Sequence, residues 1–405
     1  MSLLTSYLSN WKVSNLLQHK SYKFRIYPNK TQSIKLNNTF GCVRYVWNQF
    51  VESFNKLENH SSIKELRNIN NFLKEVSAGA LQQKERDFIE LKKQYFNKKR
   101  KTKIGRPQFK SKKKSKDSYR LPNQKFQLLS NKIKLEKIGN VKIKFDRVLP
   151  EDVKFLSCTI SRNKVKEYYV SVLVEQDIIS KEKTNKSVGL DLGIKEFMTT
   201  SDGLQVKMFD FGDNQAKIKH LQRHLARKNV GSTRFNKVKN KIAKEHLEIT
   251  RKREWLLHQI SNYLVNNYDK MVIEDLNISG MMKNHKLAGA IQKQAWSIFV
   301  SQLQYKAKWY DKEVIKINRW FPSSKLCSIC GCLKDNLKLS DRVYTCDCGN
   351  VIDRDLNASL NILFVGVNTN YRSWMECKTN DILDLSGLSL AIPNEMTNFL
   401  KFNNY

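Results

Sequence analysis

Five of the eight cysteines in this chain fall within one short stretch near its carboxyl end. Cys327 and Cys330 have the Cys-x-x-Cys spacing with which one tight turn presents two thiolates to a tetrahedral ion. We expect Cys346 and Cys348 to form the partner pair, although a single residue separates them, and Cys332 is the alternative to one member of that pair. The cluster predicts a structural zinc site. Disulfides or free buried thiols are the alternative, and disulfides would need an oxidising compartment.

Three carboxylates lie within or next to predicted strands and helices at positions from which their side chains could line a site. Asp191 lies between two leucines of an apolar strand, where its buried charge would be costly without a compensating cation. Glu274 directly follows the apolar strand 271–273, and open α/β sheets bind ligands at the carboxyl ends of their strands. Asp355 lies in the first turn of a helix that follows the cysteines. Asp353 could do the same work, or could merely favour the positive end of that helix.

The charge of the chain indicates what it binds. Its 405 residues include 73 Lys and Arg against 38 Asp and Glu, a formal net charge of +35 that would repel itself in a free compact protein. Nucleic acid is favoured over a membrane as the partner, because the sequence has neither a lipid-anchoring feature nor an apolar run of membrane-spanning length. A basic surface that serves only solubility is the alternative. Without a secretory signal, we expect a cytoplasmic, nucleoid-associated protein.

One segment, residues 92–120, is especially basic. Lys or Arg occupies 14 of its 29 positions and only Asp117 is acidic, so it cannot fold on itself. Interleaved aromatic side chains suit a surface that neutralises phosphates while rings or Arg planes lie on bases or sugars. A solvated flexible linker is the alternative. The residues that we expect to contact nucleic acid are Lys98, Lys99, Arg100, Arg106, Lys110, Lys112, Lys113 and Lys114.

The elements that must position these groups form two α+β halves. In the first half a half-buried strand covers 22–27, a helical pattern runs over 31–91, and two hairpins turn at 139–140 and 162–163. We expect a small β-barrel whose first and second strands are separated by the inserted helices. The second half combines short strands with a long basic helical hairpin, bent at 231–232, and ends in the cysteine cluster and a helix.

The order of these motifs resembles one known family. LDLG around Asp191, VIEDL around Glu274, and a four-cysteine ribbon followed by DRDLNAS resemble the split RuvC nuclease domain of the TnpB proteins of insertion sequences, relatives of the type V CRISPR effectors. YKFRIYP, GCVRYVWN and GRPQFKSK resemble the amino-terminal half of that family, so the resemblance covers residues 21–365. The single residue between Cys346 and Cys348 departs from the family's common two-residue gap.

The resemblance implies an α+β multidomain fold. An RNase H-like (RuvC) nuclease domain would carry an inserted zinc ribbon, and an amino-terminal β-barrel wedge domain would carry an inserted helical recognition domain. The expected boundaries are a leader at 1–20, the wedge domain at 21–185 with the recognition domain near 31–120, the nuclease domain at 186–365 with the zinc ribbon near 322–352, and a tail at 366–405.

The residues and the resemblance agree on a mechanism. Asp191, Glu274 and Asp355 would be the catalytic residues and would hold two Mg²⁺ ions, about 4 Å apart, that activate a water and stabilise the leaving 3′ oxygen of a phosphodiester. An all-oxygen site of hard carboxylates selects magnesium over softer ions. The zinc would be structural, because four thiolates leave no open coordination position.

By resemblance, the chain is a transposon-encoded RNA-guided DNA endonuclease. A transposon-derived guide RNA would pair with one strand of the target DNA beside a short duplex motif, and a single active site would cut both strands. One alternative is a transposase accessory or a DNA-binding regulator without cleavage, although all three carboxylates are present. The other is a DNA-strand transferase, but no tyrosine or His-hydrophobic-His motif for that chemistry is evident. We take a monomer as the acting form.

Overall fold

The computed structural model describes residues 17–100, 104–150, 153–177, 181–338 and 340–368. The chain divides into two compact units, residues 1–178 and 179–405, each with its own hydrophobic core. Most of the predicted leader and tail, up to residue 16 and from residue 369 onward, lies outside the described residues.

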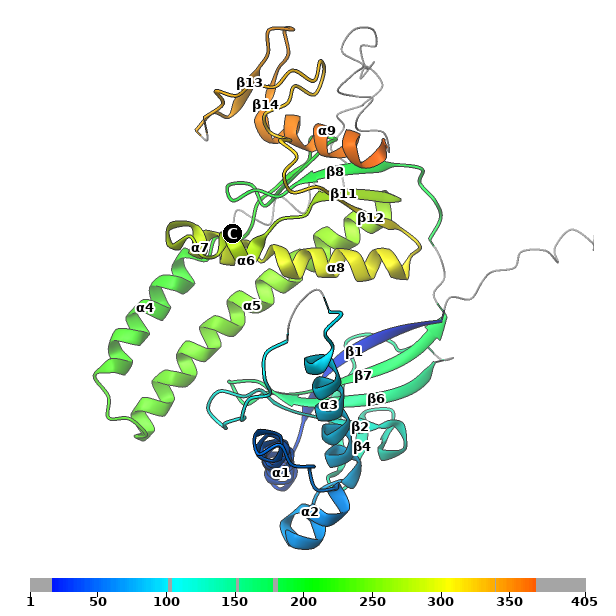
Figure 1. The fold of residues 1–405 in the computed structure, drawn as a ribbon. Coiled ribbons are helices and arrows are strands. Elements are labelled where there is room, and N and C mark those ends of the chain that lie inside the picture. Colours follow the sequence, from blue (N-terminus) through cyan, green and yellow to red (C-terminus); the bar gives the residue numbers. More distant parts are fainter. Residues whose placement is uncertain (1–16, 101–103, 151–152, 178–180, 339, 369–405) are drawn as a thin grey trace, which may run out of the picture. The chain divides into compact units, whose positions relative to one another are not determined.

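The first unit is built on a seven-stranded antiparallel sheet with the order β2-β6-β7-β1-β5-β4-β3 (Figure 1). Strand β1 begins at Leu17, before the predicted start, because it pairs with β7 from Leu17 opposite Asp177 onward. Closure of this sheet into a barrel stays a prediction. The strands are β1 (Leu17–Tyr27), β2 (Asp117–Pro122), β3 (Phe126–Leu128), β4 (Lys132–Leu135), β5 (Gly139–Lys144), β6 (Lys154–Arg162) and β7 (Tyr168–Asp177).

Three α-helices lie between β1 and β2 in the chain: α1 (Lys30–Asn55), α2 (Ile63–Ile69) and α3 (Ala78–Phe96), with short 3₁₀ turns at Asn71–Lys74 and Asn123–Lys125. Asn29 starts α1 through a capping box with Gln32, in which each side chain satisfies a backbone N–H of the other residue. The aromatic and aliphatic residues on one side of α1 belong to the hydrophobic core. Its buried residues include Phe40, Val43, Val46, Trp47 and Phe50.

The second unit contains a mixed five-stranded sheet with the order β10-β9-β8-β11-β12. Strands β8, β11 and β12 are parallel, and β9 and β10 continue the sheet in antiparallel pairing. A separate two-stranded ribbon, β13 with β14, follows β12 in the chain. The strands are β8 (Ser187–Asp191), β9 (Met198–Thr200), β10 (Gln205–Val206), β11 (Lys270–Glu274), β12 (Glu313–Ile317), β13 (Val343–Thr345) and β14 (Val351–Asp353).

Helices cover both faces of this sheet (Figure 1). Met271 and Ile273 of β11 pack with α5 and α8 on one face, while Val272 between them packs with α9 on the other. Helix α4 packs along the amino-terminal part of α5 as a hairpin. No helix among the described residues combines the length and the apolar character that crossing a bilayer requires. The helices are α4 (Gly212–Ala226), α5 (Thr233–Asn267), α6 (Ile278–Met281), α7 (His285–Gln294), α8 (Trp296–Trp309) and α9 (Arg354–Val367).

Candidate metal centres

Asp191 and Glu274 end two adjacent parallel strands at the same edge of the second sheet. Gly189 of β8 lies opposite Val272 of β11, and the two carboxylates each follow two residues later, at the carboxyl ends of their strands. Side chains two residues apart in a strand point to the same face. Both carboxylates therefore lie on the face that α9 covers.

Helix α9 brings Asp355 to this edge. The helix lies so close to β8 that a Cβ added at Gly189 would stand 2.1 Å from the backbone carbonyl oxygen of Ser359. Asp355 lies one helical turn before Ser359, about 6 Å along the helix axis. The charge of Asp355 raises the pKa of Asp191, as does that of Glu274, so these groups lie close enough to interact. The charges of Arg354 and Asp353 also act on this pKa. The structure therefore brings together the three predicted catalytic carboxylates from three separate elements.

The surroundings of Asp191 and Glu274 oppose the ionisation of their carboxyl groups. Burial, followed by the charges of Glu274 and Asp355, raises the pKa of Asp191 to about 8, against an opposing effect of Arg354. Burial also raises the pKa of Glu274, while the hydroxyl of Ser323, which donates a hydrogen bond of 2.6 Å to its Oε1, lowers it. Such crowding of acidic groups is typical of a site where a bound cation stabilises the ionised forms.

Asp353 has a structural task of its own. It is the N-cap of α9, and its Oδ1 accepts hydrogen bonds of 3.0 Å from the backbone N–H groups of Asp355 and Leu356. A capping carboxylate stabilises a helix by about 1 kcal/mol and also favours the positive end of the helix dipole. This geometry supports Asp355, rather than Asp353, as the metal ligand.

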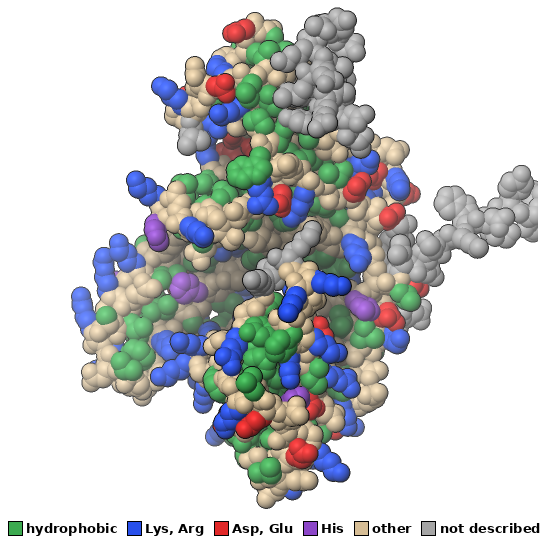
Figure 2. Space-filling view, viewed as in Figure 1, with side chains coloured by type: hydrophobic (Ala, Val, Ile, Leu, Met, Phe, Trp, Pro, Cys, Tyr) green, Lys and Arg blue, Asp and Glu red, His purple; other side chains and the backbone are tan. Residues whose placement is uncertain are grey.

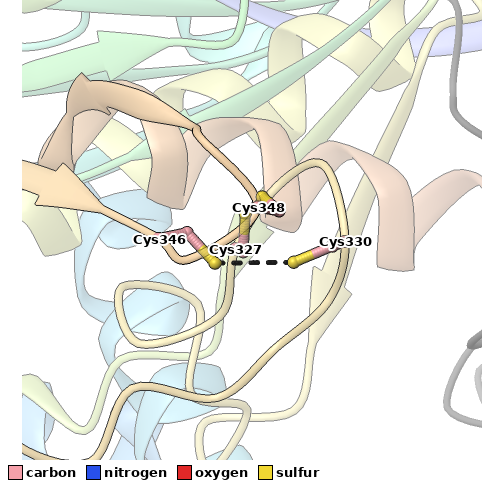
Figure 3. A group of neighbouring side chains, drawn as sticks. All are labelled: Cys327, Cys330, Cys346 and Cys348. Atoms are coloured by element: carbon pink, nitrogen blue, oxygen red, sulfur yellow. Dashed lines mark hydrogen bonds between the residues drawn. The ribbon is translucent and has the colours of Figure 1, made fainter.

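The four predicted zinc ligands converge in the segment that contains β13 and β14. The Sγ atoms of Cys327, Cys330, Cys346 and Cys348 all lie within 4.8 Å of one another. Figure 3 shows two turns that bring them together, with 3.5 Å between the sulfurs of Cys330 and Cys346 and 3.7 Å between those of Cys327 and Cys348. Both separations exceed the bond length of a disulfide, about 2.05 Å. They match the spacing of about 3.8 Å between thiolates bound tetrahedrally to zinc at about 2.3 Å.

The backbone accommodates the unusual spacing of the second cysteine pair. Each turn ends in a glycine in the left-handed region, Gly331 at a φ of 70° and Gly349 at a φ of 88°. In the first turn, the N–H of Cys327 donates a hydrogen bond of 2.9 Å to the carbonyl of Cys332. In the second turn, the N–H of Cys346 donates one of 2.9 Å to the carbonyl of Asn350. The side chain of Cys332 is exposed and lies outside the group of four sulfurs. The four sulfurs that converge are therefore those of the two expected pairs, and Cys332 lies beside Cys330 outside this group.

Two buried asparagines of α9 fasten the segment that leads into the first cysteine turn, and they were not among the predicted site residues. Asn361 donates through Nδ2 to the carbonyl oxygens of Ser323 and Leu326, both at 2.8 Å. Asn357 donates to the carbonyl of Leu326 at 2.6 Å and accepts from the N–H of Ser328 at 2.9 Å. The signal was the pair of asparagines four residues apart, which places both on one helix face.

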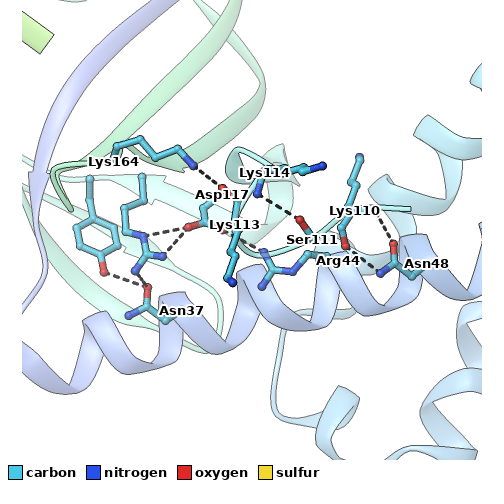
Figure 4. Close-up of polar contacts among 11 residues, drawn as sticks. Asn37, Arg44, Asn48, Lys110, Ser111, Lys113, Lys114, Asp117 and Lys164 are labelled. Carbon is cyan, nitrogen blue, oxygen red and sulfur yellow. Dashed lines mark hydrogen bonds and ion pairs between the residues drawn. The ribbon is translucent and has the colours of Figure 1, made fainter. Parts of the chain in front are cut away.

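The carboxyl part of the basic segment is docked on α1 rather than free (Figure 4). Asn48 accepts a hydrogen bond of 2.8 Å from the backbone N–H of Lys110 and donates one of 3.0 Å to its carbonyl. The indole N–H of Trp47 donates to the carbonyl of Gln108 at 3.0 Å. The ammonium of Lys110 lies 3.4 Å from the centre of the Trp47 ring, and burial lowers the pKa of Lys110 to about 8. The motifs GCVRYVWN and GRPQFKSK therefore contact each other.

The predicted nucleic-acid contacts differ in their surroundings. Lys110 packs on Trp47, and the guanidinium of Arg106 lies 5.6 Å from the ring centre of Phe54. The other members carry exposed side chains on either side of residues 101–103, which lie outside the described part of the chain. On the face drawn in Figure 2, Lys and Arg side chains far outnumber those of Asp and Glu. The exposed members of the predicted set without such a ring contact are Lys98, Lys99, Arg100, Lys112, Lys113 and Lys114.

Three family models match successive parts of the chain. One described as a helix-turn-helix domain matches residues 18–56, one described as a probable transposase matches 169–285, and one described as a Cas12f1-like TNB domain matches 296–362. Over 18–56 the structure has strand β1 and one long helix, so that description does not fit the fold there. The other two matches include all three carboxylates and all four clustered cysteines.

Relatives match along most of the chain. A protein of Streptomyces pristinaespiralis named "Putative RNA-guided DNA endonuclease" is 36% identical over 363 residues, which are 86% of this chain and 89% of the relative. The Escherichia coli K12 protein InsQ, which carries the same description, is 28% identical over 381 residues, 86% of this chain and 92% of the relative. A TnpB-like protein of Acanthamoeba polyphaga mimivirus is 29% identical over 210 residues, 48% of this chain and 39% of the relative.

Among solved structures, a Cas12f1-sgRNA-target DNA complex matches 85% of this chain and 98% of its own, with 14% identity and a TM-score of 0.46. That likeness is too weak to bear on fold or function. The identity and coverage of the Streptomyces relative, together with the transposase family model, are sufficient to assign the family. The chain belongs to the TnpB family, also called OrfB, of IS605-type insertion sequences.

Proposed function

We propose that this chain is a transposon-associated RNA-guided DNA endonuclease. The observation that carries the proposal is that Asp191 and Glu274 lie on one face of a sheet and that Asp355 is supplied by the helix packed on that face. Relatives described as RNA-guided DNA endonucleases match 86% of the chain, which supports a guide RNA and a target DNA as its partners.

The second unit supports the RuvC-type, RNase H-like nuclease domain that the resemblance implies. Its sheet places carboxylates at the carboxyl ends of adjacent parallel strands, which is where α/β sheets bind ligands. The first unit, a seven-stranded sheet with helices inserted after its first strand, would be the wedge domain with the recognition domain.

The carboxylate set fits magnesium, because every proposed donor is a hard oxygen. Asp191, Glu274 and Asp355 would hold two Mg²⁺ ions, which when bound supply an activated water and neutralise charge on the phosphodiester. The chain fixes the donors in advance: two come from paired strands, and the third from a helix packed directly on those strands. The raised pKa of Asp191 means that ionisation of this group depends on a compensating charge.

The cysteine group fits zinc in a structural role. Four thiolates complete a tetrahedral set and leave no position for a substrate or a water. The second cysteine turn is followed by β14, which ends at the N-cap of α9. The zinc would therefore hold the chain in place directly before Asp355.

The loop with Lys112, Lys113 and Lys114 fits a nucleic-acid backbone, because its exposed charges are held in place on both sides. Before it, Asn48 holds the backbone of Lys110, and after it Asp117 pairs with Arg44 and with a second arginine on β6 (Figure 4). A basic loop that is already ordered loses less conformational entropy when it binds.

The first prediction concerns the three carboxylates. Asp191→Ala, Glu274→Ala and Asp355→Ala should each lower Mg²⁺-dependent cleavage of guide-matched DNA by about 10³-fold or more, because residues that act as a unit lose nearly all activity singly. Binding of that DNA should persist, since its affinity resides in base pairing and phosphate contacts. Single-turnover cleavage and filter-binding assays would measure both.

Asp353→Asn is the matched control for these variants. An asparagine keeps the capping oxygen and removes the charge, so cleavage should remain near that of the unaltered protein. If Asp353→Asn is inactive while Asp355→Ala cleaves normally, the ligand assignment moves two residues back. If the unaltered protein with its own RNA and Mg²⁺ cuts no DNA, the chain is a binding protein and not a nuclease.

The second prediction is one zinc per chain. Protein purified without added zinc should contain it in elemental analysis, and Cys327→Ser should lose it and become less soluble, because an incomplete ligand set binds zinc weakly. Cys332→Ser should keep the metal. Folded protein without zinc would refute the site, and zinc loss in Cys332→Ser but not in Cys348→Ser would refute the choice of the second pair.

The third prediction concerns salt dependence. The quantity to measure is the slope of the logarithm of RNA affinity against the logarithm of salt concentration. Replacing Lys112, Lys113 and Lys114 with alanine should make this slope less steep by about 2 to 3, if each lysine neutralises one phosphate. The same loss of charge on β4 and β5, in Lys132→Ala/Lys134→Ala/Lys142→Ala, should change the slope less. Equal slopes for the two triple variants would mean that only net charge matters.

A further inference from the structure

Ser323 is a buried residue that lies against the proposed magnesium site. Its hydroxyl donates a hydrogen bond of 2.6 Å to Oε1 of Glu274, and it is 6% exposed. Hydrogen bonds of this length to a carboxylate are charge-assisted and stronger than neutral ones. Among the described residues, no other group donates a hydrogen bond to the Glu274 carboxylate. The other oxygen, Oε2, is thus left for a cation.

Ser323 is itself fixed to the helix that carries Asp355. Asn361 of α9, which is 1% exposed, donates to the carbonyl oxygen of Ser323 at 2.8 Å and holds Leu326, the residue before the first zinc ligand, by a second bond. A continuous path of hydrogen bonds therefore runs from α9 through Ser323 to the end of β11. The path joins elements that carry two of the three proposed metal ligands.

We propose that Ser323 is a positioning residue that orients the Glu274 carboxylate for divalent metal binding, with Asn361 fixing Ser323 relative to Asp355. The inference rests on the proposed metal site and adds to it a residue that does not touch the metal. Hydrogen-bond partners of metal ligands typically contribute 10- to 100-fold to metal affinity, because they hold the ligand in the binding orientation. Metal affinity is therefore the quantity that should change.

The experiment measures Mn²⁺ binding by the full chain without nucleic acid, by electron paramagnetic resonance, together with the Mg²⁺ concentration that half-saturates DNA cleavage. Ser323→Ala should weaken Mn²⁺ binding about 10- to 100-fold and raise the Mg²⁺ half-saturation by a similar factor. Ser324→Ala is the control, because Ser324 is adjacent but its side chain makes no hydrogen bond in the described structure; its affinity should be unchanged.

A second pair of variants separates orientation from packing. Threonine and valine have the same shape, but only threonine keeps the hydroxyl, so Ser323→Thr should bind Mn²⁺ nearly as the unaltered protein does and Ser323→Val should resemble Ser323→Ala. This pair also decides the matter if Ser323→Ala fails to fold. Zinc content and unfolding temperature, measured on every variant, report on folding.

The outcomes separate this inference from the proposed function. If the unaltered protein binds Mn²⁺ at a site that Asp191→Ala removes, and Ser323→Ala and Ser323→Val bind it equally well, the positioning role is refuted while the metal site stands. If the unaltered protein has no such Mn²⁺ site, the proposed magnesium site is wrong and the positioning role is refuted with it. Loss in Ser323→Val with retention in Ser323→Thr supports both.

Discussion

The second unit depends on the close contact between helix α9 and the sheet beneath it. Two glycines make this contact possible: a Cβ at Gly189 would lie 2.1 Å from the backbone of α9, and one at Gly366 would lie 2.2 Å from the side chain of Val272. Either substitution would push the helix away from the strands. The first turn of α9 carries Asp355, so this packing determines whether Asp355 meets the carboxylates of β8 and β11. A steric constraint between uncharged groups thus decides the geometry of the charged site.

Without a bound cation, the clustering of carboxylates that results from this packing destabilises the folded protein. Three carboxylates share a partly buried edge, where burial, followed by the charges of Glu274 and Asp355, raises the pKa of Asp191. Other contacts hold this arrangement in place: Asp353 caps α9, Asn357 and Asn361 bind the segment before the cysteines, and Ser323 holds Glu274. Zinc bound by the four cysteines would add a further constraint directly after that segment. Binding of magnesium would then relieve a repulsion that the fold has already built in.

The ionisable and metal-binding side chains of the site could be predicted from the sequence. The asparagines that form hydrogen bonds with backbone groups could not. Asp191 and Glu274 could be paired from sequence, because charged residues that end apolar strands come together wherever such strands are parallel neighbours. The asparagines of α9 and Asn48 of α1 were missed because most of their bonds are to backbone N–H or carbonyl groups, which every residue type supplies. For the same reason the docking of the basic segment on α1 was not predicted. Its contacts are long-range and leave no periodic pattern.

The most direct test of the central claim is the unfolding temperature of the second unit as a function of pH and Mg²⁺, without nucleic acid. The pKa of Asp191 is raised from 3.8 to about 8 in the folded protein, so the folded state keeps a proton that the unfolded chain has lost, and stability falls as the pH rises between these values. Mg²⁺ bound by the ionised carboxylates would reverse this loss. We predict that Mg²⁺ raises the unfolding temperature more at pH 8 than at pH 6, and that Asp191→Asn unfolds at a higher temperature than the unaltered protein without Mg²⁺ and gains little from the ion. An equal effect of Mg²⁺ on both proteins would contradict the account.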